Sequence, residues 1–239
     1  MPPDVAQRCV EREWLDDLPL DDPRAARSRR DLRTVNRIMG HAGLLCDALA
    51  RNLRTATPRI AELGAGDGTL LLRALRKARK VQRAEIVLVD TQPAVGAESI
   101  AEYEGRGHRV TIAVADAAEW LVAQRSTYDA LVANLFLHHL QQRELEALFA
   151  LASAHTSLFI ACEPRRARLP LAGSHMLGLI GCNDITRHDA VLSVRAGFTA
   201  RELSALWPTG NEWTLTERRA GVFSHVFIAA KAAAQPKLG

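Results

Sequence analysis

Three closely spaced glycines and one acid form the pattern with the clearest chemical meaning in this sequence. Glu62 lies at the end of a short apolar run, and glycines follow at positions 64, 66 and 68. Glycine lets the backbone turn sharply and lets a ligand approach where a Cβ atom would block it. A leucine-rich segment follows, and a helix starting there would offer free N–H groups and the positive end of its dipole. The pattern therefore predicts a strand, a turn and a helix that hold a nucleoside-containing cofactor.

The spacing of the glycines indicates which of two kinds of cofactor the turn would bind. The nicotinamide fingerprint is G-x-G-x-x-G, whereas residue 69 is threonine here and the third glycine comes one residue early. An acid directly before the turn is also foreign to that fingerprint. The pattern instead resembles the first motif of the class I S-adenosylmethionine-dependent methyltransferases. The resemblance makes S-adenosyl-L-methionine the expected cofactor. The residues expected to bind it at this turn are Glu62, Gly64, Ala65, Gly66 and Gly68.

Two further acids follow predicted strands. Asp90 ends the run 84–90, about 22 residues beyond the last glycine, where a doubly wound nucleotide fold places the carboxylate that binds the ribose hydroxyls. We expect Asp90 and the adjacent Thr91 to contact the cofactor; the alternative is a solvated loop aspartate. Asp116 follows the predicted strand 108–114. In the resembled family an acid at this point bonds the adenine amino group, with Ala117 as the backbone contact; the alternative is a helix N-cap.

The fourth predicted strand, residues 128–134, is followed by Leu-Phe-Leu-His-His-Leu. This pattern resembles the fourth motif of small-molecule methyltransferases, and it lacks the Asn/Asp-Pro-Pro-Tyr sequence of methylases that act on nucleobase amino groups. Ligands of open α/β sheets bind at the carboxyl ends of the strands. We therefore expect Asn134 and Leu135 beside the cofactor, where its methyl group meets the acceptor.

His138 and His139 are the predicted catalytic residues. If the acceptor is a hydroxyl group its proton must leave, and a neutral imidazole close to a phenol with a pKa near 10 would help. Such general-base assistance typically contributes about 10²–10⁴ in rate. The alternative is that one of the two histidines caps the helix beginning near residue 141. His188, beside Asp189, is a weaker candidate base, and it is predicted with Asp184 to bind the substrate. No metal site is predicted, because adjacent histidine side chains diverge and no third ligand is evident in the sequence.

From residue 59 onward, predicted strands and helices alternate, which favours a parallel sheet covered on both faces. The last two predicted strands, residues 213–219 and 224–231, are joined by a short link and should form an antiparallel hairpin. The resemblance implies an α/β, Rossmann-like class I methyltransferase fold. Its seven-stranded, mostly parallel sheet ends in such a hairpin, unlike an ordinary nicotinamide domain.

Two other regions surround this predicted domain, which spans residues 58–239. Residues 1–57 are interpreted as an N-terminal helical cap, with a first helix over residues 5–15 and a second that starts at Asp22-Pro23. Gly40 is expected to break or kink the second helix. An insertion at about 165–208 is longer than a normal connection, and its apolar content suggests a lid over a partly apolar substrate.

Composition narrows the class of protein. The 239 residues are 48% hydrophobic and 24% charged, which is ordinary for a globular domain. Four scattered cysteines without a C-x-x-C pair indicate reduced thiols and a cytoplasmic protein. The start lacks a signal-peptide pattern, and no uncharged apolar run reaches the roughly 18 residues of a membrane span. The formal net charge of +4 comes with an arginine-rich segment near the N-terminus, interpreted as a solvated helix face rather than a nucleic-acid surface.

The predicted function is S-adenosylmethionine-dependent methyl transfer to a small molecule. The motif after Asn134, the Cys162-Glu163-Pro164-Arg165-Arg166 run and residues 183–198 look similar to bacterial methyltransferases of polyketide or phenolic-lipid pathways. This suggests the hydroxyl group of an aromatic or lipid-like metabolite as the acceptor. Three alternatives stay open: an RNA or protein methyltransferase that docks through the arginine-rich helix, a nicotinamide-dependent reductase, and a cofactor-binding protein without catalysis. The acceptor, the selectivity for O, C or N and the oligomeric state are left open.

Overall fold

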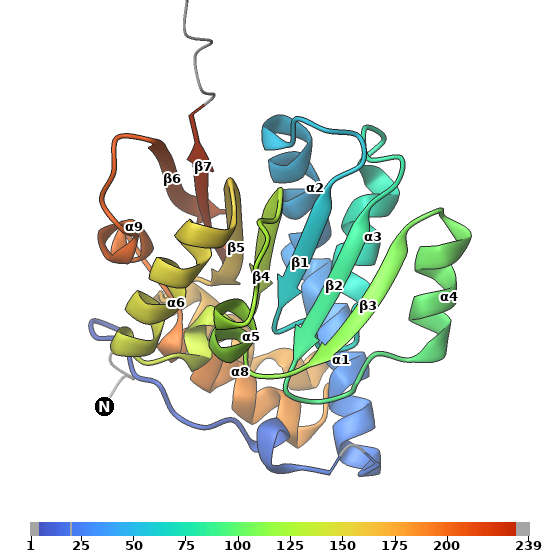
Figure 1. The fold of residues 1–239 in the computed structure, drawn as a ribbon. Helices are drawn as coiled ribbons and strands as arrows, with labels where there is room; N and C mark the ends of the chain where they lie inside the picture. Colours follow the sequence, from blue (N-terminus) through green and yellow to red (C-terminus); the bar gives the residue numbers. More distant parts are fainter. Residues whose placement is uncertain (1–4, 20, 233–239) are drawn as a thin grey trace, which may run out of the picture.

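The computed structural model describes residues 5–19 and 21–232. Within them, seven strands form one sheet in the order β3-β2-β1-β4-β5-β7-β6 (Figure 1). The first five strands in the chain run parallel, and β7 lies antiparallel between β5 and β6. The predicted seven-stranded, mostly parallel sheet with a C-terminal hairpin is therefore confirmed. The strands are β1 Arg59–Leu63, β2 Glu85–Asp90, β3 Arg109–Val114, β4 Ala130–Asn134, β5 Leu158–Pro164, β6 Trp213–Ala220 and β7 Ser224–Lys231.

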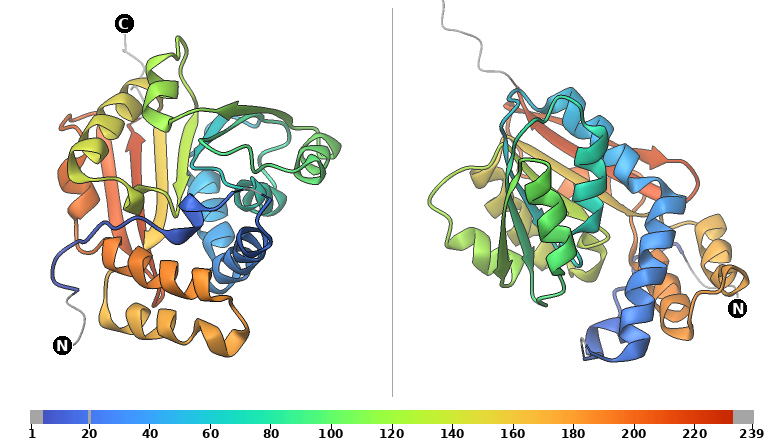
Figure 2. Two further views of the ribbon diagram at one scale, coloured as in Figure 1. Left: turned by 90° about the horizontal axis from the view of Figure 1, so that it is seen from below. Right: turned by 90° about the vertical axis from the view of Figure 1, so that its right-hand side faces the viewer.

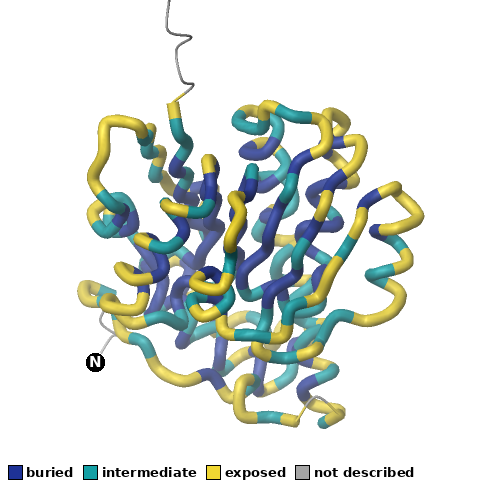
Figure 3. Tube along the Cα trace, in the orientation of Figure 1, coloured by how far each residue is buried: buried dark blue, intermediate teal, exposed yellow. Residues whose placement is uncertain are grey.

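Burial along the strands follows their place in the sheet. The inner strands β4 and β5 are buried at every residue, whereas every residue of the edge strand β3 is exposed or half-buried (Figure 3). A parallel strand covered by helices on both faces needs apolar side chains on both, which explains the continuous apolar runs. Because β1 to β5 are parallel, their carboxyl ends meet at one edge of the sheet, and the polar residues that end β2 and β4 lie there together.

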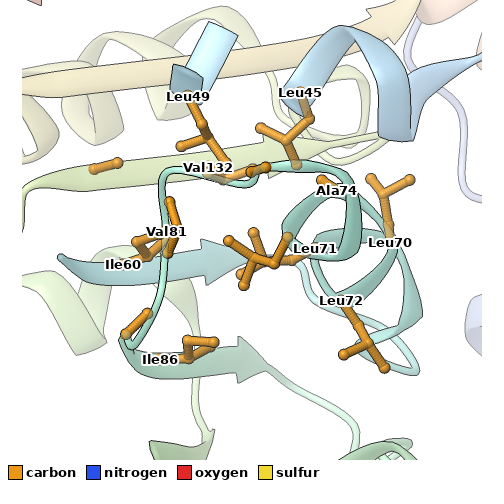
Figure 4. Packing of buried hydrophobic residues seen from close by; sticks show 14 of the residues in the cluster. Leu45, Leu49, Ile60, Leu70, Leu71, Leu72, Ala74, Val81, Ile86 and Val132 are labelled. Atoms are coloured by element: carbon orange, nitrogen blue, oxygen red, sulfur yellow. The ribbon is translucent and has the colours of Figure 1, made fainter. Parts of the chain in front are cut away.

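Helices cover both faces of the sheet. Leucines of α2 and α3 pack with Ile60, Ile86 and Val132 on one face (Figure 4). Side chains of α5, α6 and α9 pack with Leu131 and Phe159 on the other. The helices are α1 Pro23–Met39, α2 His41–Asn52, α3 Thr69–Lys77, α4 Ala97–Gly105, α5 Ala117–Val122, α6 Gln142–His155, α7 Arg168–His175, α8 Asp184–Ala196 and α9 Glu202–Leu206. No helix in residues 5–19 and 21–232 is long and apolar enough to cross a membrane.

The carboxyl edge of the sheet is covered by the N-terminal segment, α1, α7 and α8 (Figure 2). The 3₁₀-helices η1 Trp14–Asp17 and η2 Leu137–His139 lie at this edge, and η3 Leu177–Ile180 connects α7 with α8. α1 packs against α8, where the Ser28 and Thr186 hydroxyls share a hydrogen bond of 2.8 Å. Residues remote in the sequence therefore form one cover over the strand ends.

The helix predicted over residues 5–15 is wrong. Residues 5–13 carry no helix, and the turn η1 follows them. The segment is held by contacts with other parts of the chain instead of by its own hydrogen bonds. The Arg8 guanidinium donates to four backbone carbonyl oxygens at 2.7–3.2 Å, those of Leu137, His138, Leu140 and Ala196. Tertiary contacts thus override a local helical pattern.

The predicted start and break of the next helix are confirmed. The Asp22 side chain accepts a hydrogen bond from Arg24 N, and Pro23 occupies the first turn of α1, where a missing N–H costs nothing. Gly40 has a φ of 72° and separates α1 from α2. This left-handed conformation is routinely available only to glycine.

Candidate active site

One cavity of about 640 Å³ opens at the carboxyl edge of the parallel strands. The glycine turn, the ends of β2, β3 and β4, α1, η1, η2 and α8 all contribute to its wall. Most of the predicted site residues meet there. Those that line it are Glu62, Gly64, Ala65, Gly66, Asp90, Thr91, Asp116, Ala117, Asn134, Leu135, His138 and His139. Three predicted site residues of the described chain are not in its wall: Gly68, Asp184 and His188.

The glycine turn has a left-handed backbone that glycine adopts readily. Gly64, Gly66 and Gly68 have φ values of 68°, 54° and 70°, in the left-handed region that other residues enter only at a cost. A Cβ atom at Gly64 would run into the ring of Phe136, and one at Gly68 would lie 2.8 Å from Leu88. At Gly66 the added atom would meet nothing within 4 Å. Gly64 and Gly68 thus serve packing, whereas Gly66 keeps space open in the cavity.

Asp90 holds the glycine turn against the end of β2. Its Oδ2 accepts a hydrogen bond from Gly66 N at 2.8 Å, and its Oδ1 accepts one from Gln92 N at 2.9 Å. Each carboxylate oxygen has a second lone pair. Asp90 can therefore shape the turn and still accept hydrogen bonds from a ligand in the cavity.

Two acids at this turn lie in different surroundings. Glu62 is only 2% exposed, and burial, followed by the charges of Asp67 and Asp90, raises its pKa well above the usual value. This favours the neutral form of Glu62, whose Oε2 has no hydrogen-bond partner among the described residues and, when protonated, can donate to a ligand. Asp67 forms an ion pair with Arg33 at 2.7 Å. This ion pair ties α1 to the turn. Asp67 was not predicted as a site residue, although its place between two glycines was a signal.

Asp116 is the N-cap of α5. Its Oδ1 accepts hydrogen bonds from Ala118 N at 2.8 Å and Glu119 N at 3.0 Å. The capping alternative is therefore seen directly. Because both bonds use the same oxygen and Asp116 also lines the cavity, its adenine contact stays a prediction.

Asn134 is positioned by a buried histidine that the sequence analysis missed. His41 Nδ1 lies 2.6 Å from Asn134 Oδ1, and His41 Nε2 lies 2.9 Å from Ser224 Oγ. An amide oxygen only accepts, so Nδ1 donates to it and Nε2 accepts from the serine hydroxyl. Burial lowers the pKa of His41 to about 4, even though the bond to Asn134 favours the charged form. A neutral imidazole thus orients the amide at the end of β4. The next residue, Leu135, has a φ of 48°, a strained conformation that is common at functional sites.

His138 lies between two carboxylates and is 3% exposed. Its Nδ1 is 2.8 Å from Glu163 Oε2, and its Nε2 is 3.4 Å from Glu13 Oε1. Burial alone would lower the pKa of His138, but Glu13 and Glu163 outweigh it and raise that pKa to about 9. Glu163 also accepts hydrogen bonds from Phe136 N and Leu137 N, which fixes η2 against the end of β5. Neither glutamate was predicted as a site residue.

His139 is in a contrasting state. Burial, followed by the charge of His138, lowers its pKa to about 4. Its Nδ1 lies 3.8 Å from Asp16 Oδ2. Burial, then the charges of Glu13 and Asp189, raises the pKa of Asp16 to about 6. η1 and η2 therefore face each other through titratable side chains.

Two sequence arguments about these histidines are wrong. Neither histidine caps α6, because Gln141 and Glu144 form a capping box there. The reasons for excluding a metal also fail. The two rings do not diverge, since their centroids lie 4.2 Å apart at a tilt of 35°, and Glu13 of the N-terminal segment offers a third potential ligand atom. One ligand atom from each of these three residues falls within 4.8 Å of the others.

The predicted substrate residues of α8 lie elsewhere. Asp184 is exposed at the first turn of α8. His188 stacks on Trp14, with ring centroids 3.6 Å apart, and its Nδ1 lies 3.0 Å from Asp189 Oδ1. Asp189 also accepts hydrogen bonds from the backbone N–H groups of Trp14 and Leu15. The contacts of His188 and Asp189 therefore hold the N-terminal segment in place.

Comparison with known proteins agrees with this architecture. Residues 60–157 match the family model described as a methyltransferase domain, and no curated protein matches the chain. An O-methyltransferase family protein from Burkholderia thailandensis superposes with a TM-score of 0.61 at 14% identity, over 90% of this chain and 62% of that one. The mitomycin 7-O-methyltransferase MmcR superposes with a TM-score of 0.58 at 16% identity, over 91% of this chain and 60% of that one. The chain thus spans about three fifths of these two proteins.

A third structure matches over nearly its whole length. The plantazolicin methyltransferase BpumL, in complex with S-adenosylhomocysteine (SAH), superposes with a TM-score of 0.63 at 11% identity, over 89% of this chain and 92% of that one. At such identities the likeness concerns the fold. With the matched domain and the strand order, it shows that the chain has a Rossmann-like class I methyltransferase fold, with a methyltransferase domain over residues 60–157. The predicted fold is confirmed, and the matched domain agrees with the predicted methyltransferase family and with S-adenosylmethionine as the expected cofactor.

Proposed function

We propose that the protein transfers the methyl group of S-adenosylmethionine to a hydroxyl group of a small aromatic or lipid-like molecule. The observation that carries the proposal is the shared cavity, which extends from the glycine turn to His138 and His139. Its volume of about 640 Å³ suits small ligands, whose pockets measure about 300–1,000 Å³. Apolar side chains from α1, the segment after β5 and the turn between β6 and β7 line it and would suit a partly apolar acceptor. They include Leu32, Val35, Met39, Pro170, Leu177 and Phe223.

The cofactor would occupy the part of the cavity beside the glycine turn. We assign the ribose hydroxyls to Asp90 and Thr91 and the adenine to Asp116 and Ala117. Asn134, oriented by its hydrogen bond with His41, would border the transferred methyl group. Because the sulfonium already activates this group, the protein has to hold the acceptor oxygen about 3–3.5 Å from the methyl carbon.

The acceptor would enter at the other end, near η1 and η2. Its oxygen attacks the methyl carbon, the sulfur–carbon bond breaks, and the products are a methyl ether and the neutral thioether S-adenosylhomocysteine. The hydroxyl proton has to leave as well, and we place its departure at the polar group formed by Glu13, His138 and His139, which line the cavity. In the absence of a bound ion, a histidine of this group would act as the general base. Methyl-transfer rates of His138→Ala and His139→Ala test it, because rates within a fewfold of the parent in both would exclude a histidine base.

The proposed substrate class is tested by giving the purified protein methyl-labelled S-adenosylmethionine and a host lysate. We expect label in the organic-soluble fraction, and none when Asp90→Ala replaces the parent protein. Label in the RNA or protein fraction would contradict a small-molecule acceptor while leaving the fold and cofactor class intact. Absence of label, with measurable cofactor binding, would contradict methyl transfer to any acceptor in that lysate.

An RNA or protein substrate that docks through α1 has less support. Arg24, Arg27 and Arg33 of this helix each donate to an acceptor within the chain, at 2.7–2.9 Å. Arg27 and Arg33 hold α1 against neighbouring segments, and Arg24 bonds Asp22 at the start of the same helix, so these three arginines have structural roles. A steep loss of RNA affinity with rising salt would revive the alternative.

A further inference from the structure

We propose that Glu13, His138 and His139 bind a divalent transition-metal ion at the acceptor end of the cavity. Each residue offers one ligand atom, and the three atoms lie within 4.8 Å of one another. They come from two segments more than 120 residues apart in the sequence, which meet where the N-terminal segment crosses η2. Two histidines and one glutamate also form the ligand set of several catalytic zinc sites.

His138 is oriented as a metal ligand would be. Its Nδ1 is bonded to Glu163 Oε2 at 2.8 Å, so Nε2 points toward Glu13. The other Glu163 oxygen accepts two backbone N–H groups, which leaves the ring little freedom. Metal-binding histidines almost always donate their second nitrogen to such a carboxylate or carbonyl group. His138 Nε2 is fully buried and has no hydrogen-bond partner among the described residues.

The distance between Glu13 and His138 fits a shared ion better than a direct hydrogen bond. Glu13 Oε1 lies 3.4 Å from His138 Nε2, beyond the roughly 2.7–3.2 Å of an N–H···O hydrogen bond. Two ligand atoms about 2.0–2.1 Å from a tetrahedral ion are separated by about 3.3–3.4 Å. The observed separation thus equals the edge of such a coordination tetrahedron.

The ligands are held from both sides. The Ser193 hydroxyl donates to Glu13 Oε1, and Asp189 accepts the N–H groups of the next two residues of the segment. On the other side, Arg8 bonds the carbonyl oxygens of η2. Prior positioning of this kind lowers the conformational cost of collecting ligands around an ion.

Three protein ligands would leave a coordination position open to the cavity. A bound cation lowers the pKa of a coordinated hydroxyl group, so the acceptor could release its proton to solvent before its oxygen attacks the methyl carbon. This role rests on the proposed function, whereas binding of the ion does not. Imidazole ligands suit zinc and its first-row neighbours, and we therefore choose Zn²⁺ and Co²⁺ as probes.

The site is tested by calorimetric titration of chelator-treated protein with each ion. We expect one ion per parent chain and at least tenfold weaker binding by Glu13→Gln and His139→Gln. Glu163→Gln should weaken binding by about 10–100-fold through the orientation of His138. His175→Gln, which removes an exposed histidine of α7, is the matched control and should bind like the parent. Unchanged SAH affinity in each variant would show that the fold is intact.

Two results would overturn the site. One is the absence of ion binding by the parent protein, which would leave the group as an ion-pair network only. The other is binding that Glu13→Gln and His139→Gln leave unchanged, which would place the ion elsewhere. The proposed function fails separately: an ion that binds as expected, in a protein that labels no small molecule, would support the site and contradict the substrate class. Methyl transfer that persists in a chelator would remove the ion from the reaction.

Discussion

Gly66→Ala should separate cofactor binding from folding. The φ of Gly66 is +54° and a Cβ atom there would meet no protein atom within 4 Å. The cost to folding is therefore that of a left-handed alanine, about 1–2 kcal/mol. For a chain of this size each kcal/mol lowers the melting temperature by about 2–4 °C, so we expect a decrease of about 2–8 °C. The hydrogen bond from Gly66 N to Asp90 survives, because the substitution leaves the backbone donor in place.

Cofactor affinity should fall much further than stability. The added methyl group enters the cavity beside the proposed cofactor position, and we expect SAH to bind at least tenfold more weakly, a loss of about 1.4 kcal/mol or more. Gly107→Ala is the matched control. Its φ is +83° and its added atom would lie 3.8 Å from the nearest neighbour, just before β3 and thus at the opposite edge of the sheet.

The assay combines calorimetric titration with SAH and thermal unfolding of the two variants and the parent. Both variants should lose similar stability, and only Gly66→Ala should lose affinity. Equal SAH affinity in Gly66→Ala and Gly107→Ala would refute the placement of the cofactor at the glycine turn.

Three further outcomes are expected. Asp90→Ala removes the acceptor of Gly66 N and the proposed ribose contact, so its SAH affinity should fall at least tenfold by calorimetry; unchanged affinity would remove Asp90 from the site. The pKa of His41 falls from 6.5 to about 4 on folding, so the folded chain binds fewer protons than the unfolded chain in this pH range. The free energy of unfolding therefore decreases by up to about 3 kcal/mol as the pH falls from 6.5 to 4. The melting temperature of the parent should therefore fall more steeply than that of His41→Gln between pH 6.5 and 4, and parallel curves would contradict a neutral buried imidazole. Arg8→Met removes four hydrogen bonds to carbonyl oxygens, so amide hydrogen exchange of residues 5–17 should accelerate at least tenfold, whereas parent-like exchange would show that other contacts hold the segment.

Local signals explain what the sequence predicted. β1 begins and ends as expected, because Pro58 and Gly64 bound a short apolar run. The glycine turn and the end of β4 also carry their information within a few neighbouring residues. Their position in the cavity then follows from the parallel sheet, which brings the carboxyl ends of its strands to one edge.

Contacts between residues remote in the sequence explain why other site residues could not be predicted. Nothing near Glu13 in the sequence indicates that it faces His138, and Glu163 reads locally as the end of a strand. His41 lies in an apolar helix and resembles an ordinary core histidine until its contact with Asn134 is seen. Residues 5–15 also have a helical pattern, but the hydrogen bonds of Arg8 go to other elements. Such contacts depend on the tertiary structure, and no local sequence pattern indicates them.

The path of the N-terminal segment has a consequence for the order of assembly during synthesis. Cys9 N bonds to the carbonyl oxygen of Arg195, and Arg8 bonds to that of Ala196. The ribosome synthesises the partners of this segment long after the segment itself. Glu13 therefore cannot reach its final position until α8 has been synthesised. Long-range contacts of this kind form slowly. Closure of the acceptor end of the cavity is therefore a late event, and a nascent chain would acquire its glycine turn well before it could position an acceptor.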